Sequence, residues 1–209
     1  MTLKTLDAPG SIEERHLLIV EGIDDALFCE AFIRRVNLCA IEIWPIGGKT
    51  NLKRNLGLLK KLSGFSGVIA LGIIRDADDN PSGAFESVCQ ALRESNLPVP
   101  DRPGLRSDGV PVVMVMILPD AESPGNLESL CLRAISDDPV LSCVNRYFEC
   151  LDDLRISTGE IDKARVQVYL ASMEKPDRRL GESALADCWP LDNQAFDNIL
   201  QFLLSVGNI

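Results

Sequence analysis

The feature that most constrains the fold is a fourfold alternation of short apolar runs with stretches of helical periodicity. The apolar runs lie at residues 16–20, 40–46, 67–74 and 111–118. Each is followed by an amphipathic helical pattern, at residues 24–36, 50–62, 83–94 and 125–135. Fully apolar strands are covered on both faces, and helix-length crossovers join parallel strands. The alternation therefore predicts an α/β fold, a three-layer sandwich with a mostly parallel sheet of about four strands and helices on both faces.

The pattern divides the chain into a core and two flanking parts. Residues 1–15 are polar and predict a flexible lead-in, whereas residues 16–135 hold the alternating core. Helical patterns dominate afterwards, at residues 139–154, 161–171 and 193–205. Residues 136–209 are therefore expected to form a helical C-terminal extension packed on the core, without the strands of an independent domain.

The composition indicates in which cellular compartment the protein is found. No segment approaches the ~20 apolar residues of a membrane-spanning helix, and the N-terminus lacks the basic and apolar regions of a signal peptide. The seven cysteines form no CxxC pair, and only one histidine is present, so a Cys/His zinc site is poorly supported. Scattered cysteines in odd number indicate reduced thiols and a cytoplasmic protein without a membrane partner.

The net charge of −10 is unevenly distributed. Residues 1–75 carry +2, and the remainder carries −12. A chain this acidic has no broad attraction for nucleic acid, so any binding is expected to be weak in the protein alone.

Acidic residues follow three of the four apolar runs. Glu21 ends the first run, Asp76 and Asp78 end the third, and Asp120 follows the fourth. The carboxyl ends of parallel strands open on one crevice, so these side chains are expected to converge. Like charges this close need a cation between them, and hard oxygen ligands favour Mg²⁺ or Mn²⁺.

A second interpretation of some acids is helix capping. Asp24 precedes the first predicted helix, and Asp79 or Asn80 precedes the third, where each would be a good N-cap. Capping explains a single acid, but it does not explain acids gathered after several strands.

Two segments resemble the Toprim family at this point. The sequence LLIVEGIDD at residues 17–25 resembles its first motif, an apolar strand leading into VEGxxD, and IRDAD at residues 74–78 resembles its DxD motif. Toprim domains occur in topoisomerases, bacterial primases and nucleases of the overcoming-lysogenization-defect (OLD) type. The resemblance implies a Toprim-like core with Glu21, Asp76 and Asp78 at its centre.

Three further segments resemble the OLD nucleases and related stand-alone bacterial proteins of unknown function. They are GNLE at residues 125–128, DKARVQ at residues 162–167 and IGGKTN at residues 46–51. By this resemblance Glu21, Asp25, Asp76 and Asp78 hold one cation, Glu128 helps to hold a second, and Lys163 assists catalysis. The ATPase that accompanies the OLD nuclease has no counterpart among these segments. We therefore also expect that a partner protein is involved.

Basic residues gather after the second predicted strand. Lys49, Lys53, Arg54, Lys60 and Lys61 stand in a segment without an acid. They do not share one helix face, which is typical of a solvated surface. The alternative is that Lys49, Lys53 and Arg54 bind phosphates of a nucleic acid, and Lys163 has the same alternative of an ordinary exposed lysine.

Other sites fit the sequence less well. An EF-hand requires glycine where Pro81 stands, a Walker loop requires glycine where Trp44 stands, and a serine–histidine triad would need His16 from a buried strand. A receiver domain explains neither Glu21 nor Asp78, and haloacid-dehalogenase phosphatases carry DxD after their first strand.

Two functions from different classes remain open. The first is divalent-metal-dependent phosphodiester chemistry on nucleic acid, of a nuclease-like kind, which Glu128 and Lys163 favour. The second is a binding or regulatory module that retains the acidic metal pocket without turnover, which the missing basic surface favours.

Overall fold

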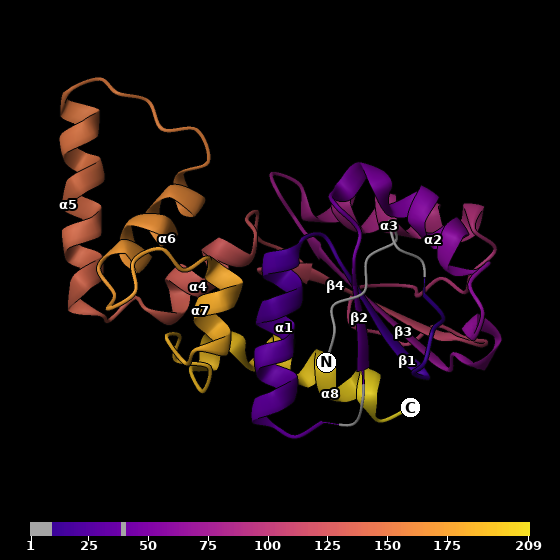
Figure 1. Ribbon diagram of the computed structural model, residues 1–209. Coiled ribbons are helices and arrows are strands. Elements are labelled where there is room, and N and C mark those ends of the chain that lie inside the picture. Colours follow the sequence, from indigo (N-terminus) through magenta and orange to yellow (C-terminus); the bar gives the residue numbers. More distant parts are fainter. Residues whose placement is uncertain (1–9, 39–40) are drawn as a thin grey trace.

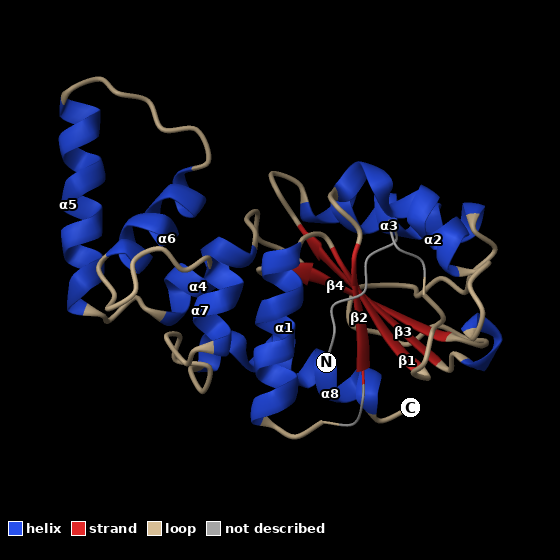
Figure 2. Cartoon of the chain, in the orientation of Figure 1, coloured by secondary structure: helices blue, strands red, loops and turns tan. Residues whose placement is uncertain are grey.

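A four-stranded, fully parallel sheet forms the centre of the computed structural model, which describes residues 10–38 and 41–209 (Figure 1; Figure 2). The strand order is β2-β1-β3-β4. The strands are β1 (His16–Val20), β2 (Ile41–Pro45), β3 (Ala70–Asp76) and β4 (Val112–Leu118). The predicted α/β class, with its parallel sheet and helical C-terminal part, is confirmed, and each strand lies within a residue or three of its expected bounds.

Helices cover both faces of the sheet, which explains why the strands are apolar throughout. Leu18 and Val20 of β1 face the cluster formed with α1 (Ile23–Arg35) and α8 (Asp197–Gly207). Leu17 and Ile19 face the opposite cluster, formed with α2 (Leu52–Leu59) and α3 (Pro81–Glu94). The period of two along each strand thus divides one apolar run between two cores.

The C-terminal part is helical, and its apolar residues continue the core on the α1 side. It comprises α4 (Leu127–Ala134), α5 (Pro139–Asp153), α6 (Ile161–Ala171), α7 (Leu180–Leu185) and α8. Figure 1 shows α5 and α6 projecting away from the sheet, while α7 lies beside α1. Helix α7 was not predicted, because its six residues are too few to display a helical period.

The segment before β1 lies against the second strand. Residues 1–9 of the expected lead-in are outside the described residues. Ile12 is buried, and the amides of Glu13 and Glu14 donate to the Glu42 carboxylate of β2, at 2.8 and 3.0 Å. Residues 10–15 therefore lie along that edge of the sheet.

The helix caps differ in part from the expectation. Helix α1 begins after Gly22, and the Asp25 carboxylate accepts the Gly22 amide, so Asp24 is not the N-cap. Asn80 caps α3 through the Gly83 amide, and Asp79 does not. Asp24 and Asp79 are thereby left for other contacts. No helix in the described part of the chain is long and apolar enough to cross a bilayer.

Gly181 sets the distance between α7 and α1. A Cβ at this position would lie 2.6 Å from the Asp24 carbonyl oxygen and 2.7 Å from the Leu27 Cβ. Gly181→Ala should therefore lower the free energy of unfolding by about 1–3 kcal/mol, because α7 must move away from α1. Chemical denaturation measures the change.

Gly57→Ala is the matched control, since Gly57 lies in α2 and a Cβ there meets nothing within 4 Å. It should raise stability by roughly 0.5–1 kcal/mol through helix propensity alone. Equal effects of the two substitutions would show that α7 does not pack closely on α1.

Candidate functional site

An open cleft of about 1240 Å³ lies at the carboxyl ends of the strands. Strands β1 and β3 pair directly, with Ile19 opposite Ile73, so the residues that follow them emerge side by side. Of the residues predicted for the site, seven line this cleft: Glu21, Asp25, Lys49, Asp76, Asp78, Glu128 and Lys163. Lys53 and Arg54 lie on the first turn of α2, outside the cleft lining.

The turn after β3 is fastened to the start of α4. The amide of Asp78 donates to the Gly125 carbonyl at 2.9 Å, and the amide of Gly125 donates back at 2.7 Å. Asp78 adopts a left-handed conformation with a φ of 50°, which this pair of bonds holds. The amide of Leu127 then donates to Asp76 Oδ1 at 3.2 Å. The GNLE segment therefore positions both aspartates, besides bringing Glu128 into the cleft.

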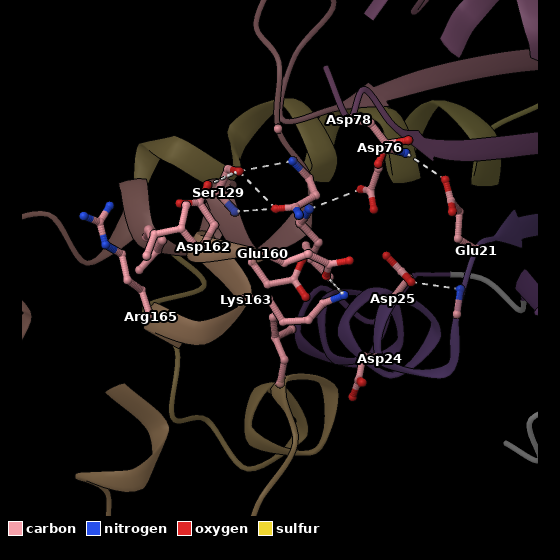
Figure 3. A pocket seen from close by; sticks show the side chains of 18 of the residues that line it. Glu21, Asp24, Asp25, Asp76, Asp78, Ser129, Glu160, Asp162, Lys163 and Arg165 are labelled. Atoms are coloured by element: carbon pink, nitrogen blue, oxygen red, sulfur yellow. Dashed lines mark hydrogen bonds and ion pairs between the residues drawn. The ribbon is translucent and has the colours of Figure 1, made fainter. Parts of the chain in front are cut away.

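Three carboxylates of the cleft, those of Asp25, Asp76 and Glu128, are half-buried and have raised pKa values. Burial, together with the charges of Asp25, Glu128 and Asp78, raises the pKa of Asp76 to about 8. Burial raises the pKa of Asp25 to about 6, with Glu128 again contributing. Burial also raises the pKa of Glu128. Figure 3 shows Asp25 and Asp76 pointing toward one another, with Lys163 reaching toward them from α6.

The other two predicted ligands are already paired with cations. The Arg75 guanidinium forms an ion pair with Glu21, and its second terminal nitrogen lies 3.7 Å from Asp78. The amide of Asp76 also donates to Glu21, at 3.2 Å. Lys49 Nζ donates to Asp78 Oδ2 at 2.8 Å. Arg75 was not predicted: the sequence shows a basic residue before Asp76, and only the fold reveals that its side chain is buried.

The remaining cations of the cleft are mostly paired too. Lys163 donates to Glu160 at 2.5 Å, and this bond raises the pKa of the lysine. Arg179 of the segment before α7 binds Asp24 at 2.9 Å. Arg165, which the sequence analysis also missed, forms no ion pair with any described residue; it lies over the Phe148 ring, 5.9 Å from its centre. Figure 3 shows it pointing away from the acids.

The chemistry of this donor set fits a hard divalent cation. Within residues 10–38 and 41–209, no three acidic, histidine or cysteine side chains already surround one ion position. Mg²⁺ does not require such a cage, because it keeps several waters and uses one or two carboxylates together with substrate phosphates. The raised pKa of Asp76 supports the fit, since a cation beside it would stabilise the ionised form that burial disfavours.

Comparisons with known proteins give one family and one solved structure. The family model described as "Protein of unknown function (DUF3226)" matches residues 15–208. The solved C-terminal region of the Burkholderia pseudomallei OLD protein is similar, with a TM-score of 0.51 and 14% identity, over 93% of this chain and 98% of that one. No curated protein matches. The structural likeness establishes a shared fold with that OLD region.

Asp76→Asn should stabilise the metal-free protein in a pH-dependent manner. The pKa of Asp76 rises from 3.8 to about 8 on folding. Between these two pH values the folded chain therefore binds the proton more tightly than the unfolded chain does. Stability conferred by the protonated group is present below pH ~4 and is lost as the pH rises toward ~8. Asparagine carries no such charge, so the Tm of the variant should exceed that of the parent by more as the pH rises. The difference should reach ~4–8 °C at pH 8.

Thermal unfolding in a chelator at pH 5 and pH 8 measures this gain. Asp79→Asn is the matched control, because its exposed side chain lies in the same turn. It should change the free energy of unfolding by less than about 0.5 kcal/mol. A parent and an Asp76→Asn variant with the same pH dependence would contradict the buried charge at this position.

Proposed function

The chain belongs to the DUF3226 family of proteins of unknown function, and from its cleft we propose that it carries out divalent-metal-dependent phosphodiester chemistry on nucleic acid, of a nuclease-like kind. The observation that carries the proposal is the group of half-buried carboxylates Asp25, Asp76 and Glu128, which come from the first turn of α1, the end of β3 and the first turn of α4. These acids have no ion pair within the described residues, which is the environment that a resident cation requires.

The sequence motifs give the proposal its reaction class. The VEGxxD and DxD segments begin at the last residues of β1 and β3, as the Toprim resemblance implies, and the GNLE segment opens α4. The OLD-like fold is consistent with a Toprim-type site. We therefore place the predicted cofactor, Mg²⁺ or Mn²⁺, among the cleft carboxylates.

Each cleft residue has a role in the proposed reaction. Asp25, Asp76 and Glu128 would hold the cation, which when bound stabilises charge developing on the phosphate oxygens. Lys163 stays protonated, because its hydrogen bond with Glu160 raises its pKa, and its charge would neutralise the phosphate. Arg165 carries a charge without an ion pair among the described residues, and would bind a phosphate further along the strand.

A second function is favoured by the pairing of the cleft cations. Lys49 and Lys163 are each bound to a carboxylate, so a phosphate must compete with Asp78 or Glu160 to reach them. In a regulatory or binding module that retains the acidic pocket, no phosphate would have to displace Asp78 or Glu160 from the lysines. Such a module would bind the divalent cation and a partner protein, without turnover.

Lys163→Ala should abolish cleavage while leaving nucleic-acid binding within about twofold, because a charge acting on the reacting phosphate contributes ~10²–10³ to the rate and little to binding. The test is a nuclease assay with Mg²⁺ and with Mn²⁺ on single- and double-stranded DNA and RNA. Lys175→Ala, at an exposed lysine outside the cleft, should cleave at the rate of the parent. A parent protein that cuts none of these substrates would leave the regulatory module as the function.

Charge reversal at Lys53 and Arg54 should weaken binding to all sequences alike, because phosphate contacts carry no base information. These residues continue from Lys49 onto the exposed start of α2, where a bound strand would leave the cleft. Fluorescence anisotropy should show binding that needs divalent metal and falls as salt rises. Lys61→Glu, beyond the far end of α2, is the control, and an equal loss there would indicate a purely diffuse attraction.

A further inference from the structure

Arg75 occupies a position where the Toprim resemblance expects a metal ion. Its side chain is 9% exposed and lies between two predicted ligands. One terminal nitrogen binds Glu21 Oε1, and the other lies 3.7 Å from Asp78 Oδ2. A guanidinium cannot lose its proton at physiological pH, so this charge is permanent.

Lys49 completes the neutralisation of the same two acids. Its Nζ lies 2.8 Å from Asp78 Oδ2, in an ion pair whose two side chains are both exposed. Glu21 and Asp78 together carry two negative charges, and Arg75 and Lys49 supply two positive charges. These two acids are therefore neutralised before any metal binds.

Glu21 is further engaged by the backbone of its neighbouring strand. The same Oε1 atom that accepts from Arg75 also accepts the amide of Asp76, at 3.2 Å. If Oε1 turned toward a cation, both bonds would be lost and a buried guanidinium would be left without its partner. A buried charge that loses its partner is strongly destabilising, which opposes this movement.

The other three predicted ligands, Asp25, Asp76 and Glu128, are not neutralised in this way. The first two accept hydrogen bonds from the amides of Gly22 and Leu127, and within the described residues none of the three forms an ion pair. Backbone amides orient a carboxyl group but bring no cation to it. The five predicted ligands thus divide into two neutralised acids and three that still lack a cation.

We propose, on the basis of the metal-dependent function above, that Arg75 and Lys49 take the place of one metal ion and that the cleft binds a single divalent cation through Asp25, Asp76 and Glu128. Glu21 is then a positioning residue, which holds Arg75 and the end of β3. Asp78 is the partner of Lys49. A second ion beside Arg75 would meet a like charge in a poorly solvated place.

Isothermal titration of the full chain with Mn²⁺ tests the proposal without relying on activity. The parent should bind about one ion per chain. Glu21→Gln keeps an acceptor for both hydrogen bonds, and Asp78→Asn alters an exposed pair, so each should change the Mn²⁺ affinity by less than about threefold. Asp25→Asn and Asp76→Asn should each weaken it by more than about tenfold, because each removes a charged ligand.

The possible outcomes separate this inference from the proposed function. A parent that binds two ions, or a tenfold loss with Glu21→Gln or Asp78→Asn, would overturn the single-ion site and leave the metal-dependent function standing. A folded parent that binds no Mn²⁺ would overturn both. Thermal unfolding checks each variant, and if Glu21→Gln does not fold, Asp78→Asn decides, since its side chain is 45% exposed.

Discussion

The parallel pairing of β1 with β3 brings Glu21, Asp76 and Asp78 to one end of the sheet. Their register puts Ile19 opposite Ile73, so Glu21 and the Asp76–Asp78 turn leave the sheet next to each other. Both strands are buried on both faces, and a slip of one residue would exchange the two apolar clusters. The same hydrophobic burial that fixes the fold therefore also forces carboxylates together, a repulsion that bound or built-in cations must relieve.

The structure relieves that repulsion in two different ways. Around Glu21 and Asp78 it uses side chains, and Arg75 is brought in by β3 itself, one residue before Asp76. Around Asp25, Asp76 and Glu128 it supplies only amides from Gly22 and Leu127. A protein that simply tolerated clustered acids would gain from pairing all of them. The uneven treatment is what singles out the second group as the place for a ligand.

The sequence predicts the sheet and the gathering of acids, because both depend on local periodicity and on which residue follows each strand. The cationic partners of those acids cannot be predicted in the same way. Arg75 lies 54 residues along the chain from its partner Glu21, and Lys49 lies 29 residues from Asp78. Arg179 lies 155 residues from Asp24. No spacing rule in the sequence reveals pairs so far apart. Helix α7 escaped prediction for a related reason: its place is fixed by close packing of Gly181 on α1, which leaves no periodic signal.

The acidity of the whole chain and the chemistry of the cleft are compatible when the cations are considered one by one. Lys49 and Lys163 are held by single, exposed ion pairs with Asp78 and Glu160, which contribute little free energy and are exchanged easily. Arg75 is held in a buried pair that does not exchange. A phosphate entering the cleft could therefore recruit the two lysines while Arg75 stays in place. Selectivity for a polyanion would then come from the cleft and its metal, and the surrounding negative surface would discourage binding elsewhere.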